Sequence, residues 1–568
     1  MRPSLPHDFS PNHDVTHGSL PTGISWYRKV FTLHQSDYSK RITVEFDGMF
    51  RNSTVWLNGH YLGSCLSGYT SCQFDITELC NYGQSNALAV RTDATEYELW
   101  SYEGGGIYRN VRLIKTHPVH VDLWGTFVQT EIREEDGRKT ALVRVAATVC
   151  NETENDVTCT VVSKIQDPHG RIAATSQSLL SIQSMGKNEE HQELTVPDPE
   201  LWRPASPALY KLITTLTVDG YEVDSYETPF GIRNVRFDPE KGFFLNGVPM
   251  KLKGACCHQD HAGVGIAIPD RLQEWRIERL KEMGGNAYRS AHNPTSPALL
   301  DACDRLGLMV MDENMILGSS PEILAQLETM VRRGRNHPSI ILWSLGNEEM
   351  NVQHTEPGIR LLRKMQDLVH KLDPTRPVTY AMNCDWVSIV DKHEEEGFEL
   401  DVFGANYTCD RKGEVYDEFH RKYPSRCLLG TETGGSASTR GLYEEEQSGI
   451  LLELSVHEKR IVVWSNPKRK EIVSAYRETF TTWGKSIIDT WKECAERSCI
   501  SSPTGTGGWE KSPSTSGATA TAQKPAYPLT ERVWAGRGWR KTDTFSGRFP
   551  TSPAGWWPKG STRRGIWC

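Results

Sequence analysis

The sequence predicts a multidomain protein in which two all-β sandwiches precede a (β/α) barrel. Short runs with strand-like alternation, broken by turn residues, fill the chain as far as about Arg233. From about Phe237 onwards, apolar strand-like runs alternate with helical ones, which is typical of parallel strands closed into a barrel. The length of 568 residues leaves room for about four domains at roughly 150 residues each.

Composition and charge exclude several classes of protein. Hydrophobic residues make up 38% of the chain and charged residues 24%, which is ordinary for a globular protein and excludes a disordered or collagen-like one. The net charge of −8 offers no basic footprint for nucleic acid or for an anionic membrane. No apolar run could span a membrane, and the start of the chain lacks the apolar stretch of a secretory signal. We therefore expect a neutral partner and, by default, a cytoplasmic protein.

The fourteen cysteines predict reduced thiols rather than a disulfide scaffold. They are scattered without CxxC pairs or a regular framework, and they include the adjacent Cys256 and Cys257. A zinc site of the Cys/His type is not expected either, because the ligand spacing of such sites does not occur.

The first sandwich is predicted between Trp26 and His120. Its strands alternate apolar and polar residues, and the dipeptide Asn58-Gly59 is typical of a tight hairpin turn. The clearest predicted strands span residues 26–33, 42–46 and 53–57. A smaller second sandwich follows, with predicted strands at 141–145, 159–162 and 212–218, and it ends near Arg233.

The barrel is predicted from seven apolar strands that alternate with helices. The predicted strands span residues 250–257, 287–290, 308–312, 340–345, 377–382, 401–406 and 426–430. The predicted helices span residues 271–283, 297–306, 321–333 and 358–372. In such a barrel the chemistry gathers at the carboxyl ends of the strands. An eighth strand is not evident, and past about Ser501 the chain becomes rich in Gly, Pro and Trp and poor in aliphatic residues, which predicts a disordered tail.

Two carboxylates follow strands of this barrel. Glu348 comes after the strand at 340–345, and Glu432 ends the run that begins at 426, so both should project into the same mouth. A pair of acids placed in this way is typical of glycoside cleavage, in which one protonates the departing oxygen and the other attacks or activates water. The rival interpretation of each Glu alone is a helix cap or a rim ion pair. Glu349 competes with Glu348, and alternation along an extended chain means that both cannot face the cavity.

Three further polar residues lie on or directly after the first two predicted barrel strands. His258 and His292 could each donate hydrogen bonds to sugar hydroxyls, or could cap turns and satisfy buried carbonyls. Arg289 could hold a nucleophilic carboxylate ionised, or could form a structural ion pair. No phosphate-binding loop, HExxH helix or GxSxG elbow occurs, so phosphoryl transfer, metalloproteolysis and serine hydrolysis are not supported.

At these residues the chain resembles glycoside hydrolase family 2, and among its members the β-galactosidases. Three motifs carry the likeness. They are Asn286-Ala287-Tyr288-Arg289-Ser290-Ala291-His292-Asn293-Pro294, then Arg335-Asn336-His337-Pro338 leading into Trp343-Ser344-Leu345-Gly346-Asn347-Glu348, and Leu429-Gly430-Thr431-Glu432. The likeness also includes Trp26-Tyr27-Arg28-Lys29, Val55-Trp56-Leu57-Asn58-Gly59 and Gly105-Gly106-Ile107-Tyr108-Arg109, so that it covers residues 5–497.

The resemblance implies a sugar-binding jelly roll over residues 1–118, an immunoglobulin-like β-sandwich over 119–232 and a catalytic (β/α)8 TIM barrel over 233–500, with 501–568 as an unrelated tail. It implies that Glu348 is the acid/base and Glu432 the nucleophile of a retaining enzyme. Asn347 would contact the sugar 2-hydroxyl. The resemblance further implies that Tyr407 hydrogen-bonds the nucleophile with Arg289 beside it, and that His258 and His292 contact the sugar.

The chain also departs from the family pattern. Some family β-galactosidases bind magnesium through a Glu-x-His after the third strand. This chain has Asn314-Met315-Ile316-Leu317-Gly318 there instead, so no metal or other cofactor is expected. The Asn-x-Lys of glucuronate recognition is expected beyond the eighth strand, and the one candidate, Asn466-Pro467-Lys468, precedes it. Residues 5–8 resemble a motif that follows the first jelly-roll strands, which predicts an N-terminal truncation. The tail from Ser498 replaces the aromatic eighth strand, as a changed reading frame would.

Together these features predict a retaining exo-β-glycosidase that hydrolyses terminal β-D-galactosides and needs no cofactor. The expected partner is its carbohydrate substrate, without nucleic acid or membrane, and a homo-oligomer is compatible with the sequence. The alternatives are a β-glucuronidase or β-mannosidase with the same machinery, or a catalytically defective carbohydrate-binding relative.

Overall fold

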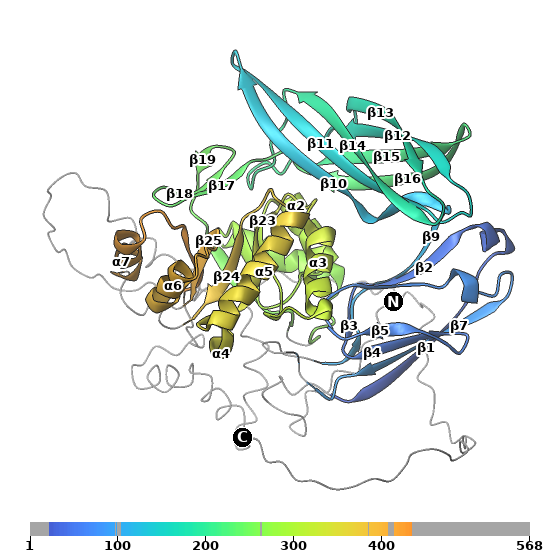
Figure 1. Ribbon diagram of the computed structural model, residues 1–568, viewed down its shortest axis with the longest axis horizontal. Helices are drawn as coiled ribbons and strands as arrows, with labels where there is room; N and C mark the ends of the chain where they lie inside the picture. The colour runs from blue at the N-terminus through green and yellow to red at the C-terminus, as the bar shows by residue number, and fades with distance from the viewer. Residues whose placement is uncertain are drawn as a thin grey trace, which may run out of the picture.

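The computed structural model describes residues 22–96, 98, 104–261, 264–383, 386–406 and 414–433. In chain order they form two β-sandwiches and then a curled parallel sheet covered by helices, which confirms the predicted fold class (Figure 1). The predictions for residues 5–8, for 466–468, for the eighth strand and for the tail concern parts of the chain outside the described residues.

The first sandwich pairs a four-stranded sheet with a three-stranded one. The first sheet has the order β1 (Ile24–Thr32), β7 (Ser85–Asp93), β4 (Ser53–Leu57) and β5 (His60–Cys65). The second has the order β6 (Cys72–Asp75), β2 (Arg41–Phe46) and β9 (Val111–Thr116), and a ribbon joins β3 (Met49–Phe50) to β8 (Gly106–Ile107). Two short 3₁₀ helices, η2 (Gln35–Ser39) and η3 (Thr77–Leu79), complete it. Because side chains alternate along each strand, Val44, Val55 and Val90 are buried between the sheets, and the predicted strands are confirmed.

One pair of cysteines corrects the sequence prediction. Cys65 at the end of β5 and Cys72 at the start of β6 form a disulfide, with Cα atoms 6.4 Å apart. The prediction of reduced thiols is wrong for this pair, because the chain between residues 65 and 72 returns and brings the two strand ends to bonding distance. Nothing in the spacing of the cysteines reveals that return.

The second sandwich is also built from a three-stranded and a four-stranded sheet. The first has the order β10 (Val119–Glu135), β11 (Arg138–Asn151) and β14 (Gly186–Pro197). The second has the order β13 (Ile172–Ile182), β12 (Val157–Gln166), β15 (Tyr210–Val218) and β16 (Tyr221–Phe230). A small sheet of β17 (Val235–Asp238), β18 (Gly242–Leu245) and β19 (Val248–Pro249) then leads into the barrel.

Seven parallel strands form the described part of the barrel, in chain order across the sheet. They are β20 (Gly254–Cys257), β21 (Ala287–Ser290), β22 (Met309–Glu313), β23 (Ile340–Asn347), β24 (Val378–Met382), β25 (Val402–Asn406) and β26 (Leu428–Glu432). The sheet is curled, since the Cys256 thiol on β20 lies 3.3 Å from the Thr431 carbonyl oxygen on β26. The first and the seventh strand therefore contribute to one interior.

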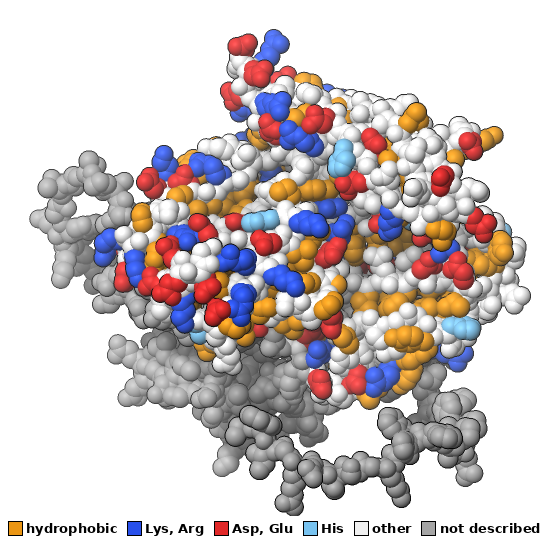
Figure 2. Space-filling view, in the orientation of Figure 1, with side chains coloured by type: hydrophobic (Ala, Val, Ile, Leu, Met, Phe, Trp, Pro, Cys, Tyr) orange, Lys and Arg blue, Asp and Glu red, His pale blue; other side chains and the backbone are white. Residues whose placement is uncertain are grey.

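Helices connect these strands and cover the outside of the sheet. They are α1 (Asp270–Glu282), α2 (Pro297–Leu306), α3 (Pro321–Gly334), α4 (Met350–Gln353), α5 (Glu356–Leu372), α6 (Trp386–Glu395) and α7 (Glu414–Lys422). The predicted strands and the four predicted helices are confirmed, whereas α4, α6 and α7 were not predicted. On the face seen in Figure 2, basic and acidic side chains are interspersed over α3, α5 and α6.

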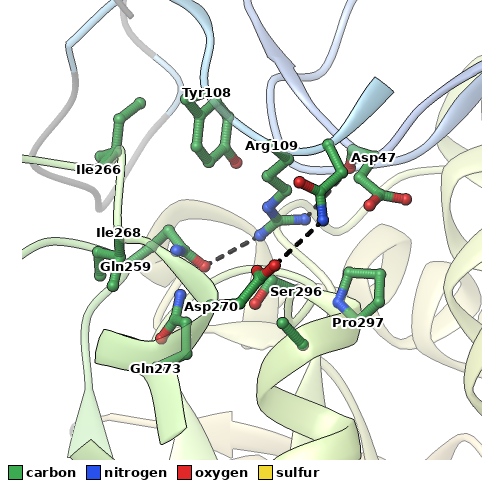
Figure 3. Close-up of a pocket in the computed structure, with 12 residues that line it drawn as sticks. Asp47, Tyr108, Arg109, Gln259, Ile266, Ile268, Asp270, Gln273, Ser296 and Pro297 are labelled. Carbon is green, nitrogen blue, oxygen red and sulfur yellow. Dashed lines mark hydrogen bonds between the residues drawn. The ribbon is translucent and has the colours of Figure 1, made fainter. Parts of the chain in front are cut away.

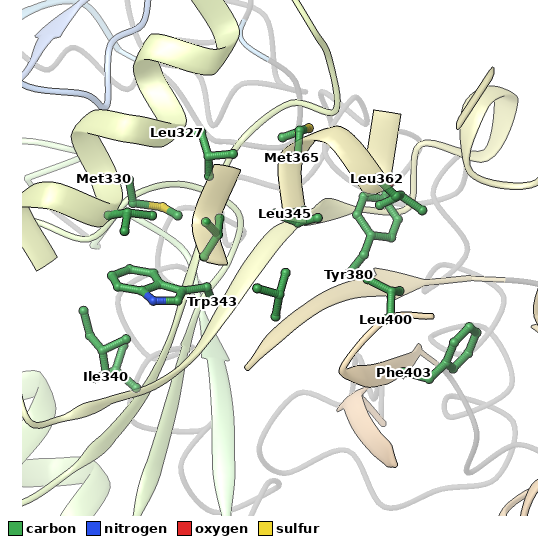
Figure 4. Close-up of a cluster of buried hydrophobic side chains, with 14 of the residues drawn as sticks. Leu327, Met330, Ile340, Trp343, Leu345, Leu362, Met365, Tyr380, Leu400 and Phe403 are labelled. Atoms are coloured by element: carbon green, nitrogen blue, oxygen red, sulfur yellow. The ribbon is translucent and has the colours of Figure 1, made fainter. Parts of the chain in front are cut away.

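Helix α5 shows how the sequence sets this packing. Thr355 caps its start, because the Thr355 hydroxyl accepts a hydrogen bond from the Gly358 amide at 3.1 Å. One helix face carries apolar residues at intervals of three or four, namely Ile359, Leu362, Met365 and Val369. All four side chains are buried in the layer between helices and sheet, where they meet residues of β23 and β24 such as Trp343 and Tyr380 (Figure 4).

Candidate active site

Polar side chains gather at the carboxyl ends of five barrel strands. They are Arg289 on β21, Glu313 on β22, Asn347 at the end of β23 with Glu348 directly after it, Asn406 on β25 and Glu432 on β26. Parallel strands end at the same rim of a curled sheet. Arg289 and Glu432 therefore come into contact although they lie 143 positions apart in the chain. All of these side chains are buried except that of Glu432, which is 21% exposed.

Asn406 lies between the two predicted catalytic carboxylates. Its side-chain nitrogen lies 2.6 Å from Oε1 of Glu348 and 3.5 Å from Oε2 of Glu432. These two distances together limit the separation of the two carboxylate oxygens to about 6.1 Å. Thr431 fixes the amide, since its hydroxyl donates to the Asn406 side-chain oxygen at 2.6 Å and leaves the nitrogen turned towards the acids.

Arg289 joins the exposed carboxylate to a fully buried one. Its Nη1 lies 3.0 Å from Oε2 of Glu432, while Nε and Nη2 each lie 3.0 Å from an oxygen of Glu313. Burial by itself would lower the pKa of Arg289, but the charges of Glu313 and Glu432 raise it above its ordinary value. The guanidinium therefore stays charged, and it favours the ionised form of Glu432.

Glu348 is turned inward by an unusual backbone conformation. Its φ angle is 46°, and its amide donates a hydrogen bond to the Ala381 carbonyl on β24 at 3.0 Å. Burial raises the pKa of the Glu348 carboxyl, and the negative charge of Glu432 raises it further against the opposing hydrogen bond from Asn406. Glu348 therefore keeps its proton to a higher pH than an exposed glutamate does.

Glu349 has different surroundings from Glu348. Its Oε1 accepts a hydrogen bond from the Leu317 amide at 2.5 Å, in the loop after β22. Burial raises the pKa of Glu349 to about 7. The two neighbouring carboxyls thus have separate partners: Glu348 is hydrogen-bonded to Asn406, and Glu349 to the Leu317 amide.

Asn347 and the two histidines complete the cluster. The Asn347 side-chain oxygen accepts hydrogen bonds from Arg289 at 2.8 Å and from Asn406 at 3.1 Å. Nδ1 of His292 lies 2.7 Å from Glu313, and the His292 ring packs edge-to-face on the ring of His258 with centroids 5.3 Å apart. Six of the seven predicted site residues are thus brought together, and the seventh, Tyr407, lies outside the described residues.

Sequence reasoning missed Glu313 and Asn406. Glu313 is 0% exposed and accepts hydrogen bonds from Arg289 and from the Ser344 hydroxyl, the latter at 2.8 Å. Both residues directly end or follow predicted strands, at 308–312 and 401–406, which is the same signal that indicated Glu348.

Among the described residues, no group of three or more His, Cys, Asp or Glu side chains is arranged to hold a metal ion. After β22, the Asn314 side chain donates to the Ile316 carbonyl of its own loop at 2.7 Å. No described helix is both long and apolar enough to cross a membrane.

Comparisons with known families match each of the three parts. "Glycosyl hydrolase 2 galactose-binding domain-like" matches residues 22–103, and "Glycosyl hydrolases family 2" matches residues 119–233. "Glycosyl hydrolases family 2, TIM barrel domain" matches residues 238–322 and 318–422.

Among curated proteins, the chain is 33% identical to beta-galactosidase BoGH2A of Bacteroides ovatus, over 88% of this chain and 63% of that protein. It is 32% identical to a putative beta-glucuronidase of Formosa agariphila, over 82% of this chain and 44% of that protein. The chain thus spans less than two thirds of the length of these relatives.

Two solved structures are also similar to this chain. A glycosyl hydrolase family 2 member from Bacteroides cellulosilyticus has a TM-score of 0.70 at 35% identity, over 76% of this chain and 59% of that one. Bacteroides uniformis beta-glucuronidase 2, covalently bound to cyclophellitol-6-carboxylate aziridine, has a TM-score of 0.68 at 28% identity, over 81% and 59%. With three family-2 domains matched in the family order and the same architecture in solved members, the chain belongs to glycoside hydrolase family 2.

Proposed function

We propose that this chain is a retaining exo-β-glycosidase that hydrolyses terminal non-reducing β-D-galactosides by double displacement. The observation that carries the proposal is the Glu348–Asn406–Glu432 bridge. It limits the separation between Oε1 of Glu348 and Oε2 of Glu432 to about 6.1 Å. Retaining enzymes hold their carboxyl groups about 5–5.5 Å apart, whereas inverting ones need roughly 6.5–9.5 Å to admit a water. The bridge therefore supports an acid and a nucleophile over an acid and a water-activating base.

In the first step, a carboxylate oxygen of Glu432 attacks the anomeric carbon and the bond to the glycosidic oxygen breaks. Glu348 gives its proton to that oxygen, so the aglycone leaves as a neutral alcohol. In the second step, Glu348 takes a proton from water, the water oxygen attacks the anomeric carbon, and the ester bond to Glu432 breaks. Both carboxyls then return to their starting states.

The surroundings of the acids support this division of roles. Arg289, at 3.0 Å, favours the ionised Glu432 that attack requires. Burial and the charge of Glu432 raise the pKa of Glu348, which favours the protonated acid that departure requires. Once Glu432 is esterified its charge is gone, so the pKa of Glu348 falls and Glu348 can serve as the base of the second step.

The remaining polar residues would orient the sugar and the catalytic groups. We assign Asn347, His258 and His292 to contacts with the glycosyl unit, in keeping with their places beside the acids. Glu313 is a positioning residue, because it holds Arg289 at two atoms and His292 at one. Tyr407 is proposed as a partner of the nucleophile from its place in the sequence directly after Asn406.

A galactoside is the proposed substrate on two grounds. The Bacteroides ovatus relative is named a beta-galactosidase, and in the described part of the chain the guanidinium beside the acids, Arg289, is engaged by Glu313 and Glu432 rather than turned to a substrate carboxylate. The second candidate is a β-glucuronide, because other relatives at similar identity are named beta-glucuronidases. The covalent adduct of the Bacteroides uniformis relative supports double displacement for either sugar.

The test compares 4-nitrophenyl β-galactoside, β-glucuronide and β-mannoside as substrates of the full chain. We expect the highest kcat/KM on the galactoside, and proton NMR should show the β-anomer as the first-formed sugar. A faster glucuronide or mannoside would replace the substrate but keep the mechanism, whereas a first-formed α-anomer would overturn it. Binding of galactosides without turnover would indicate the carbohydrate-binding relative.

A further inference from the structure

A buried arginine of the first sandwich reaches both histidine-bearing loops of the barrel. Arg109 lies between β8 and β9 and is 3% exposed. In Figure 3 its guanidinium points from the sandwich towards the barrel. Nη2 donates one hydrogen bond to the Gln259 side-chain oxygen and one to the Pro294 carbonyl, both at 2.9 Å. Gln259 is next to His258 in the chain, and Pro294 is two residues after His292.

The sandwich holds the other side of this guanidinium. Nη1 of Arg109 donates to the Tyr69 carbonyl at 2.7 Å, and the Arg109 Cζ lies 5.2 Å from the centre of the Tyr108 ring. Gly48 makes room for the side chain, since a Cβ at that position would lie 2.8 Å from the Arg109 Cδ. Residues of the first sandwich therefore hold the arginine on one side, and the barrel loops bind its other side.

The two loops are fixed to each other only a short distance further on. The His258 and His292 rings touch edge-to-face at 5.3 Å, and His292 lies 2.7 Å from the buried carboxylate of Glu313. A shift of either loop therefore changes the spacing of the rings that face the sugar. A misplacement of roughly 1 Å can lower an enzymatic rate about 10²-fold.

We propose that Arg109 is a positioning residue that sets the spacing of His258 and His292, so that the first sandwich controls the geometry of the sugar-binding mouth. The proposal rests on the sugar contacts assigned to the two histidines above. This role requires the planar guanidinium of arginine, because Nη2 donates to both loops while Nη1 donates to the Tyr69 carbonyl. A lysine ammonium cannot reproduce that arrangement.

The test uses the variants R109M and R109K of the full chain, with N336A as the matched control. Asn336 also joins a sandwich to the barrel, because its side chain bonds the Thr126 carbonyl and the Val128 amide, both at 2.9 Å, but it touches neither histidine loop. We expect R109M to lower kcat/KM by about 10- to 100-fold and R109K by less, with N336A within about twofold of the parent. Equal losses in R109M and N336A, or no loss in R109M, would overturn the proposal.

A double-mutant comparison separates positioning from general destabilisation. If Arg109 acts through the histidines, R109M should cost at most about threefold when introduced into the H258A/H292A background. A full penalty in that background contradicts the proposal. E348Q tests the proposed function separately. If Glu348 is not the acid/base, E348Q leaves turnover unchanged, and this result does not depend on the effect of R109M.

Hydrogen exchange tests the same inference without turnover. We expect faster amide exchange in peptides 256–261 and 290–296 of R109M, and unchanged exchange there in N336A. R109K keeps the buried positive charge and serves where R109M does not fold. Unchanged protection of both peptides in a folded Arg109 variant would overturn the proposal.

Discussion

The two ends of the barrel strands bury charge in opposite ways. At the carboxyl ends, the guanidinium of Arg289 contacts two carboxylates, those of Glu313 and Glu432, while Asn406 joins a third, that of Glu348, to the same cluster. Burial and the charge of Glu432 raise the pKa of Glu348, so the excess of acid over base favours the protonated form of that carboxyl. This is the form that the proposed acid step requires.

At the amino ends, one buried arginine is paired with a buried carboxylate, and the neighbouring Arg233 guanidinium donates to backbone carbonyls instead. Arg376 and Asp373 form an ion pair at 2.7 Å with side chains 5% and 0% exposed, and the Trp343 indole donates to the same carboxylate at 2.8 Å. Burial would raise the pKa of Asp373, but Arg376 and hydrogen bonds from Thr375 and Trp343 lower it below its ordinary value. The difference teaches that one end of the same strands is arranged for chemistry and the other for stability.

Glu432→Gln should produce the largest effect of any change at the mouth. Without the nucleophilic carboxylate we expect kcat/KM on the best substrate to fall by at least about 10⁴-fold, while the melting temperature stays close to that of the parent. Steady-state kinetics and thermal unfolding check both parts. A variant that loses stability instead of activity would remove the contrast between the two ends.

Glu348→Gln should lower kcat/KM by about 10²- to 10⁴-fold, because the general acid is lost. The pH profile sharpens this prediction. The acid works in its protonated form, so parent activity should fall as the pH rises through the raised pKa of Glu348. That alkaline limb should be absent from the residual activity of the variant, and its persistence there would assign the limb to another group.

Asp373→Asn should act at the opposite end and on stability. Leaving Arg376 buried without its ionised partner should cost about 3 kcal/mol in unfolding free energy, with kcat/KM unchanged. Since the pKa of Asp373 is lowered in the folded protein, its contribution is present above the ordinary Asp pKa of about 4 and is lost as the pH falls through the lowered value. Denaturant titrations at several pH values should show this loss in the parent and a weaker one in the variant.

Glu356→Gln should have the smallest effect. Glu356 pairs with Arg360 one turn along α5, with both side chains about 60% exposed, and such surface pairs contribute at most about 0.5 kcal/mol. A melting temperature within error of the parent is expected. A large shift would mean that stability in this barrel is not concentrated in its buried pairs.

Much of the barrel could be predicted because its strands are apolar and its helices have capped, periodic sequences. The predicted bounds of 287–290 and 297–306 are those observed for β21 and α2. Helices α6 and α7, of ten and nine residues, lack the proline that marks the first turn of α2, α3 and α5, and they were not predicted. The Cys65–Cys72 disulfide depends on how two strand ends meet, which spacing does not show.

The acids of the candidate site could be predicted from the sequence, but the hydrogen bonds and ion pairs that join them could not. Glu348 and Glu432 follow strands, so topology alone places them at one rim. Two features depend on the register of neighbouring strands, namely the Asn406 bridge and the ion pair between Glu313 and Arg289. That register follows from packing rather than from any one segment. Likewise, the reach of Arg109 joins residues 150 and 185 positions apart.

The central claim is that Glu432 forms the covalent intermediate, and trapping tests it most directly. The full chain would be incubated with a galactose-configured cyclophellitol aziridine, whose strained ring a nucleophilic carboxylate opens, and its peptides analysed by mass spectrometry. We predict one adduct, on Glu432, that is prevented by excess substrate and absent from E432Q. An adduct on Glu348 or Glu313, or equal labelling of E432Q, would contradict the account.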